Sequence, residues 1–280
     1  MNAPGPTVTA TTDEIMIVNA ARRLGAQAAA GKPVCFVGIG LPSTAANLAR
    51  RLYDPPPVLI YESSCIGSKP SRLPLSIGDG ELAETADAVV SVPEIFAYWL
   101  QAGRIDIGFL SGAQLDRFAN INSTVIGDYY DPTTRLPGAG GAPEIAASAG
   151  AVMVIMRQSK RAFVERCDFR TSFGLGDGPG DRQRLGLRGG GVKWVITDLG
   201  VMEPDPESCE LTVSALHPGV TPEQITDATG WQLQFADVLN TTEAPTEHEL
   251  STLRALGETA TRSNVHPLID APVKTPRRTP

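Results

Sequence analysis

Apolar residues recur along this chain in two alternating patterns, namely short continuous runs and longer stretches with helical spacing. Continuous runs are typical of strands that are covered on both faces, and they occur at residues 34–39, 58–61, 105–110, 152–156, 192–197 and 211–216. Helices are predicted at residues 11–30, 40–52, 93–99, 143–150 and from 221 onward. Strands that alternate with helices predict an α/β fold: an open, mainly parallel sheet flanked by helices.

Local signals place several helix ends and the domain limits. Thr11 and Glu14 have the spacing of a capping box, and Gly31 is a suitable stop for the same helix. Pro93 and Pro222 suit the first turn of a helix, where a missing N–H costs nothing. Because the sequence shows no internal repeat and no long linker, we expect one domain over residues 11–260. Residues 1–10 and 261–280 are expected to be loose tails, since both ends are rich in Pro and Thr.

Composition and charge narrow the classes of function. Of 280 residues, 42% are hydrophobic and 20% charged, which is enough apolar material for a substantial core. Lys and Arg total 24 against 31 Asp and Glu, and this acidic balance argues against a nucleic-acid partner. The apolar runs are too short to span a membrane, and the N-terminus does not resemble a secretory signal. Four separated cysteines and three histidines without ligand spacing predict no metal site and a cytoplasmic protein with free thiols.

Glu62 is the first candidate for chemistry, because it directly follows the strand predicted at 58–61. Open α/β sheets bind ligands at the carboxyl ends of their strands, and a carboxylate there can be a nucleophile, a base or a ribose ligand. Gly38 and Gly40 form a turn after the neighbouring strand, where backbone amides could hold a phosphate. Taken alone, these residues are better explained as a solvated strand-end glutamate and a purely steric glycine turn, so they do not decide the function.

Two further segments favour a functional site. A glycine-rich loop precedes the helix predicted at 143–150, and its successive backbone N–H groups suit an oxyanion; its candidate residues are Gly138, Gly140, Gly141 and Ala142. A stretch dense in amide and hydroxyl side chains follows the strand at 105–110, and its candidates are Gln114, Asn120 and Asn122. Polar side chains at this density suit a site better than a core.

Five segments together resemble a known family. They read VGIGLPSTAANLARRL, IYESS, SGAQLDRFANINSTVIGDYYDPTTRLPGAGGAPEIA, KRAFVE and DGPGDRQRLGL. In this order they are similar to the β subunits of class I CoA-transferases of the glutaconate CoA-transferase type. The resemblance extends over roughly residues 13–240, and the long block at 111–146 is its most specific part.

The resemblance implies a ping-pong transfer of CoA from an acyl-CoA to a carboxylic acid. Glu62 would be the nucleophile that carries a glutamyl-CoA thioester, the amides of Gly140 or Gly141 would bind the oxyanion, and Asn120–Asn122 would orient Glu62. Coenzyme A thioester would be a substrate, with no permanently bound cofactor. A separate α subunit would complete the active site. Ser64 stands where the family has glycine, which is expected to tighten the loop beside the nucleophile.

Two alternatives remain beside this interpretation. The first is an acyl-CoA hydrolase or C–C ring-opening hydrolase of the same family, and the second is a non-catalytic ligand-binding module on the same scaffold. The presence of Glu62 together with the glycine loop favours the transferase. Phe96, Tyr98 and Trp99 are interpreted as packing residues of a helix, and Arg182 and Arg184 as structural or subunit-contact residues.

Overall fold

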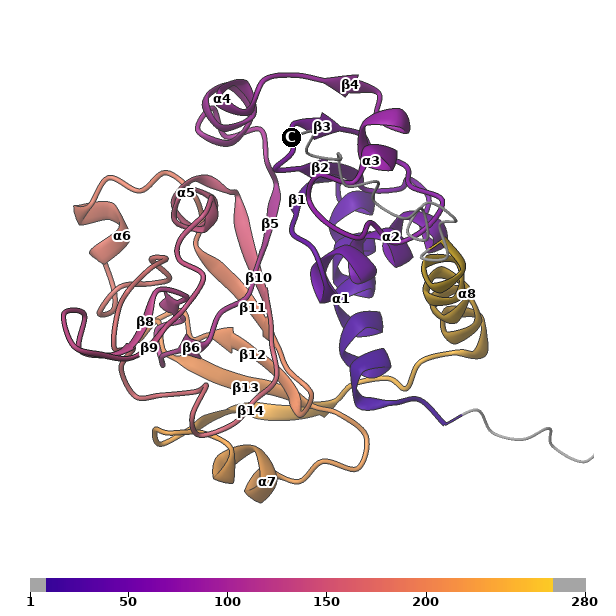
Figure 1. Ribbon diagram of the computed structural model, residues 1–280. Helices are drawn as coiled ribbons and strands as arrows, with labels where there is room; N and C mark the ends of the chain where they lie inside the picture. The colour runs from indigo at the N-terminus through magenta and orange to yellow at the C-terminus, as the bar shows by residue number, and fades with distance from the viewer. Residues whose placement is uncertain (1–8, 264–280) are drawn as a thin grey trace, which may run out of the picture.

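The computed structural model describes residues 9–263, and its centre is a ten-stranded sheet with the order β14-β13-β12-β11-β10-β5-β1-β2-β3-β4 (Figure 1). Five neighbouring central strands are parallel, and all five come from the apolar runs of the sequence. They are β1 (Val34–Val37), β2 (Val58–Tyr61), β5 (Ile107–Leu110), β10 (Ala151–Ile155) and β11 (Val192–Ile196). The predicted α/β class with a mainly parallel sheet is therefore confirmed.

The two flanks of the sheet contain the antiparallel pairings. On one flank β12 (Gly200–Pro204) pairs antiparallel with β11 and with β13 (Leu211–Leu216), and β14 (Gln234–Thr241) lies parallel to β13. On the other flank β3 (Cys65–Ile66) and β4 (Ala88–Val89) are antiparallel. Two hairpins lie outside the sheet: β6 (Gln114–Leu115) with β7 (Ile121–Asn122), and β8 (Val125–Gly127) with β9 (Pro132–Arg135). Most of these strands are too short or too polar to show as apolar runs.

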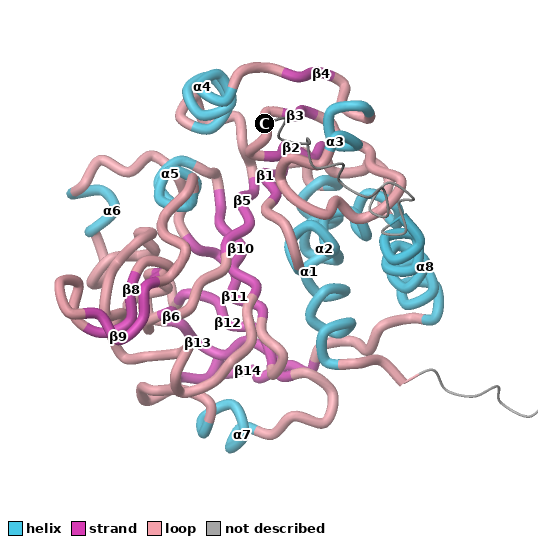
Figure 2. The backbone as a smooth tube through the Cα atoms, in the orientation of Figure 1, coloured by secondary structure: helices cyan, strands magenta, loops and turns pink. Residues whose placement is uncertain are grey.

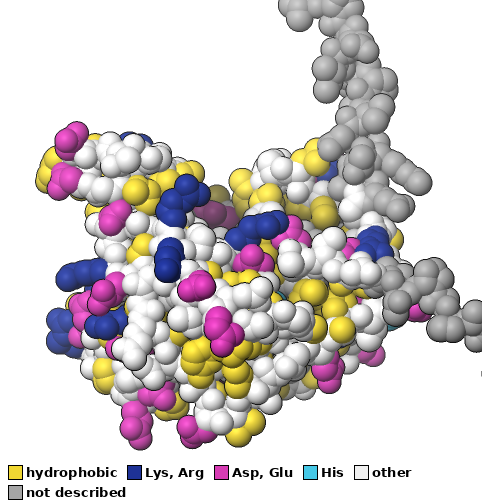
Figure 3. Space-filling model, turned by 90° about the horizontal axis from the view of Figure 1, so that it is seen from below, with side chains coloured by type: hydrophobic (Ala, Val, Ile, Leu, Met, Phe, Trp, Pro, Cys, Tyr) yellow, Lys and Arg dark blue, Asp and Glu magenta, His cyan; other side chains and the backbone are white. Residues whose placement is uncertain are grey.

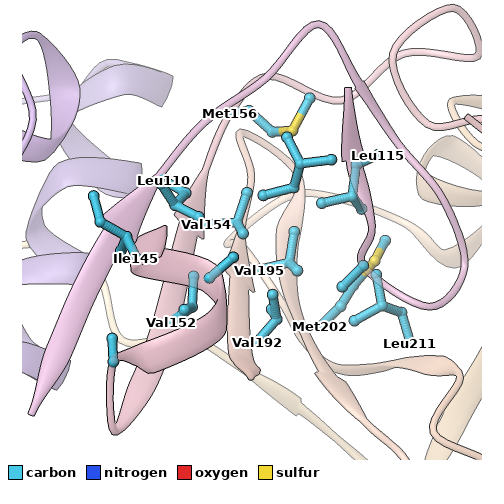
Figure 4. Packing of buried hydrophobic residues seen from close by; sticks show 14 of the residues in the cluster. Leu110, Leu115, Ile145, Val152, Val154, Met156, Val192, Val195, Met202 and Leu211 are labelled. Carbon is cyan, nitrogen blue, oxygen red and sulfur yellow. The ribbon is translucent and has the colours of Figure 1, made fainter. Parts of the chain in front are cut away.

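Helices cover both faces of the sheet and create two cores. One face is covered by α1 (Thr12–Ala29), α2 (Leu41–Leu52) and α8 (Glu247–Ser263), which stand together in Figure 2. On the other face lie α5 (Ala142–Ser148) and the π-helix η1 (Ile95–Leu100). In Figure 4, Ile145 of α5 packs beside Leu110 and Val152 of the strands below it. The remaining helices are short: α3 (Gly80–Glu84), α4 (Val92–Glu94), α6 (Asp181–Arg184) and α7 (Pro222–Asp227).

Several local predictions are confirmed and others are corrected. The capping box of Thr11 and Glu14 is present, and Gly31 follows α1 with φ +78°. The strand expected at 34–39 ends at Val37, because the chain turns at residues 38–40 into α2. The single helix expected at 93–99 is a short α-helical turn continued by a π-helix.

The described residues include little of either expected tail. α8 continues to Ser263, whereas residues 1–8 and 264–280, which hold most of both expected tails, lie outside the described residues. Among the described helices, none combines the length and the apolar character needed to cross a membrane. On the face drawn in Figure 3, acidic and basic side chains are interspersed among apolar ones.

Candidate active site

Glu62 lies at the carboxyl edge of the parallel strands. β1 and β2 end in register, with Val37 beside Tyr61, so Glu62 and the Gly38–Gly40 turn leave the sheet at the same edge. Successive strand residues face opposite sides, and Tyr61 is buried in the core under α1 and α2. Its hydroxyl is anchored there by Asn47 Nδ2 at 2.9 Å. The next residue, Glu62, is therefore directed toward the layer of α5 and η1.

A tight hairpin presents the Glu62 side chain. Tyr61 pairs with Cys65, which leaves a three-residue loop, and the N–H of Ser64 donates to Tyr61 O at 2.9 Å. Ser64 has φ +73°, the left-handed conformation that the third residue of such loops adopts and that favours glycine. Its side chain is buried, and Ser64 Oγ has no hydrogen-bond partner among the described residues. Ser64 therefore sits in a strained backbone conformation beside Glu62.

The structure brings Glu62 to the predicted glycine loop. A Cβ atom placed on Gly141 would lie 2.9 Å from Glu62 Oε1 and 2.7 Å from Phe96 Cζ. The half-buried carboxylate makes no hydrogen bond or ion pair within residues 9–263. Glu62 and Gly141 are 79 positions apart in the printed sequence, and only the fold makes them neighbours. A carboxylate without a partner is available as a nucleophile or base.

Close packing of α5 on the sheet determines where this loop lies. Gly108 of β5 lies under the helix, because a Cβ there would be 2.4 Å from Ile145 Cγ2. Ser123 holds Gly138 from the other side: the N–H of Gly138 donates to Ser123 O at 2.9 Å, and Ser123 Oγ donates to Gly138 O at 2.8 Å. In the described part of the chain, the N–H groups of Gly140 and Gly141 donate to no protein acceptor. These two amides are free to bind an anion.

Gln114 and Asn122 support the glycine loop indirectly. They face each other across the β6–β7 hairpin, where Asn122 Nδ2 donates to Gln114 Oε1 at 2.7 Å. Gln114 also donates to Asp168 Oδ2 at 3.0 Å. Asn122 Oδ1 accepts the N–H of Thr124, which shapes the turn containing Ser123. Both amides are buried and bonded to each other, so they hold the segment that in turn holds Gly138.

Asn120 serves a separate buried network. Its Nδ2 donates to both carboxylate oxygens of Asp116 at 3.0 Å and to Gly176 O at 2.7 Å, while its Oδ1 accepts the N–H of Gly174. Burial raises the pKa of Asp116, although Asn120 and two backbone N–H groups oppose that effect by donating to the carboxylate. The polar atoms of Asn120 and Asn122 are thus occupied elsewhere, and neither residue bonds directly to Glu62, contrary to the expected orienting contact.

Two important residues received no site role from the sequence. Phe96, interpreted as a packing residue, lies against Gly141 beside the carboxylate. Arg182 is buried and donates to five carbonyl oxygens, including those of Ala146 and Ala147 at the end of α5. An aromatic residue in an apolar helix and an arginine in a polar loop carry no distinguishing local signal. Burial lowers the pKa of Arg182, and its role here is structural.

The buried histidine His217 also has a structural role. His217 is buried, and its ring nitrogens lie 2.8 Å from Thr242 Oγ1 and from Thr197 O. Burial lowers its pKa and keeps the ring neutral. Within residues 9–263, no three His, Cys, Asp or Glu side chains come together in a way that could hold a metal ion. His266 lies outside the described residues.

Known proteins resemble this chain over most of its length. The model of the coenzyme A transferase family matches residues 25–228. A subunit of the 3-oxoadipate CoA-transferase of Pseudomonas knackmussii is 61% identical over 246 residues, covering 88% of this chain and 93% of the relative. A subunit of the glutaconate CoA-transferase of Acidaminococcus fermentans is 37% identical, covering 76% and 81%.

A solved structure extends the likeness to three dimensions. The crystal structure of glutaconate coenzyme A-transferase from Acidaminococcus fermentans superposes with a TM-score of 0.81 at 33% identity, and the match covers 88% of this chain and 94% of that one. The family model spans most of the chain and includes Glu62 and the glycine loop. The chain belongs to the coenzyme A transferase family.

Proposed function

We propose that this protein is the catalytic β subunit of a CoA-transferase, which moves CoA from an acyl-CoA to a carboxylic acid through a thioester on Glu62. The observation that carries the proposal is the unpaired Glu62 carboxylate beside Gly141, at the carboxyl edge of the sheet. Nucleophilic catalysis by a carboxylate needs an oxygen with an available lone pair, close to donors for the developing oxyanion. The site supports both conditions.

The proposed reaction proceeds in balanced steps. The Glu62 carboxylate attacks the thioester carbonyl of the donor, and the CoA thiolate leaves, so that a mixed anhydride forms. The thiolate then attacks the glutamyl carbonyl, which releases the donor acid and leaves CoA on Glu62. The acceptor carboxylate reverses both steps and departs as the new acyl-CoA. Each tetrahedral intermediate carries a negative oxygen, and the free amides of Gly140 and Gly141 are the proposed donors to it.

The identity of 61% with a 3-oxoadipate CoA-transferase subunit supports a 3-oxo dicarboxylate as one of the acids exchanged. The lower identity of 37% with a glutaconate CoA-transferase subunit supports the same reaction on another dicarboxylate. A screen of acyl-CoA donors against 3-oxoadipate, glutaconate and a monocarboxylate of similar length tests this proposal. Equal turnover with the monocarboxylate would contradict a site built for dicarboxylates.

We also propose that a separate α subunit completes the site, because each of the two relatives is named as one subunit of its enzyme. Exposed apolar side chains lie on the elements next to Glu62, namely Val89 of β4, Val92 of α4 and Tyr98 of η1, which are 58%, 50% and 64% exposed. These side chains suit an apolar subunit contact. Size-exclusion chromatography with light scattering, with and without a co-expressed α-type subunit, tests the pairing. Full turnover by the lone chain would contradict it.

Free thiols at all four cysteines support a cytoplasmic setting, in which thiols stay reduced.

The covalent step has its own test. Incubation of the αβ complex with acyl-CoA, followed by borohydride, should reduce the thioester and change the mass of the peptide that contains Glu62. Glu62→Ala should abolish transfer and leave the fold intact. An active complex whose Glu62 peptide is never modified would exclude the mechanism. Thioester decay to free CoA as the main outcome would favour the hydrolase alternative, and substrate binding without turnover would favour a non-catalytic module.

A further inference from the structure

Phe96 shares the face of Gly141 with the Glu62 carboxylate. Two atoms of the Phe96 ring, Cζ and Cε1, lie 2.7 and 3.0 Å from the point where a Cβ of Gly141 would be, and Glu62 Oε1 lies 2.9 Å from that point. The ring and the carboxylate therefore both border the same side of Gly141. A ring offers the carboxylate no hydrogen bond, so its placement there needs a physical reason.

The Phe96 ring is held firmly in this place. It packs on Phe36 of β1, with ring centroids 5.9 Å apart and an interplanar angle of 56°. The π-helix that carries it is anchored in the core by Ile95 and Leu100, both fully buried. Gln101, directly after η1, donates to Glu144 of α5 at 2.6 Å. The π-helical turn and the start of α5 are thus joined, and the ring lies against Gly141 in the glycine loop.

We infer that Phe96 is a specificity-determining residue, which keeps water away from the Glu62 side chain and so directs the glutamyl-CoA thioester to transfer instead of hydrolysis. The inference rests on the proposed function, since it requires a thioester on Glu62. In the reaction that the ring suppresses, a water oxygen attacks the glutamyl carbonyl and the C–S bond breaks. The thiolate takes one proton of the water, the other proton goes to solvent, and Glu62 regains its carboxylate with one oxygen from solvent. An apolar wall leaves the attacking water without space or hydrogen-bond partners beside that carbonyl.

The test uses the αβ complex with Phe96→Ala, loaded with acyl-CoA in ¹⁸O-labelled water without an acceptor acid. Two measurements are taken: release of the free CoA thiol, and ¹⁸O in the peptide that contains Glu62. We expect the variant to form the thioester and to lose it to water about tenfold faster or more than the unmodified complex. Phe96→Leu keeps part of the apolar volume and should raise hydrolysis by a smaller factor. It also provides the test if the alanine variant does not fold.

Phe235→Ala is the matched control, because Phe235 packs partly buried against the same apolar cluster but lies on β14, at the opposite end of the sheet from β2. It should hydrolyse the thioester at the unmodified rate. Equal hydrolysis rates for the unmodified, Phe96→Leu and Phe96→Ala complexes, with the thioester present in all, would overturn the role of Phe96. Slower thioester formation with unchanged hydrolysis would also overturn it, since the ring would then be a substrate contact. Absence of any thioester in the unmodified complex would instead overturn the proposed function itself.

Discussion

Replacement of Gly141 by alanine tests the arrangement of the site most directly. Gly141 has φ −83° and ψ −1°, which alanine adopts without strain, so the backbone does not oppose the change. The new methyl group would lie 2.9 Å from Glu62 Oε1 and 2.7 Å from Phe96 Cζ. Both are closer than the 3.4 Å at which ordinary van der Waals contact begins. The backbone is fixed by α5, and therefore the two side chains must move.

The size of the expected effect follows from this displacement. The carboxylate has to retreat by about half an ångström or more, and a misplacement of about 1 Å typically costs roughly hundredfold in rate. We expect kcat to fall between about tenfold and about hundredfold. The melting temperature should change little. Overcrowding of two side chains lowers stability, but replacement of glycine in an α-helical conformation offsets this by about 0.4–1 kcal/mol through the unfolded state.

The assay compares kcat and the melting temperature of the αβ complex with Gly141→Ala and with a control glycine. Gly257 lies in α8, on the sheet face opposite α5 and η1, and nothing lies within 4 Å of its Cβ position. Gly257→Ala should raise stability by about 0.5–1 kcal/mol and leave kcat unchanged. Full turnover by Gly141→Ala would refute the close approach of the glycine loop to the carboxylate. Early melting, with normal activity of the folded fraction, would show that the loop is only structural.

Three further substitutions test stability by urea unfolding. Ser64→Gly should raise the free energy of unfolding by about 1 kcal/mol, because it relieves a left-handed backbone, and an unchanged value would contradict the strain. Arg182→Lys should lower the free energy of unfolding by about 2–4 kcal/mol, since buried carbonyls lose their donors. The same change at the exposed Arg184 should lower it by less than about 0.5 kcal/mol. Similar losses for the two variants would contradict the structural role of the buried Arg182. Bidentate pairing with Arg72 lowers the pKa of Asp79 to about 2. Asp79→Asn should therefore lower the free energy of unfolding by about 2 kcal/mol at pH 7. The stabilisation by the ion pair is present above the ordinary carboxyl pKa and is lost as the pH falls toward the lowered pKa, so this difference should shrink between about pH 4 and pH 3. A difference that stays constant over this range would contradict the lowered pKa.

The sequence located most parts of the site but not their contacts. Glu62 was identified because it ends an apolar strand, and the glycine loop because consecutive glycines expose amides. Neither pattern says that Gly141 faces Glu62. That contact depends on how closely α5 packs on β5, which Gly108 makes possible. Phe96 could not be assigned a site role from sequence, since an aromatic residue in an apolar helix has the same pattern whether it faces a core or a carboxylate.

For the amide side chains too, the sequence located the residues but not their contacts. Asn120 and Asn122 stood out because such polar density is unusual after a buried strand, and the structure explains that density by hydrogen bonds within the chain. Local sequence reveals that polar groups must be satisfied, whereas the partner of each group is decided by long-range folding. Asn120 and Asn122 were expected to orient Glu62, and within the described residues neither forms a direct hydrogen bond with it.

By itself the sequence determined the central parallel strands, the first capped helix and the α/β class. These follow from local physics, namely continuous apolar runs, cap residues and glycine or proline at turns. The sequence also predicted β13 as the apolar run at 211–216, but the antiparallel pairing of the flanks, their other strands, the π-helix and α8 were decided by tertiary structure, because short or polar segments become regular only when neighbouring elements pair or pack with them. The site belongs to this second group. Its carboxylate, its free amides and its aromatic wall come from three distant segments, and only the packing of α5 and η1 on one sheet face brings them together.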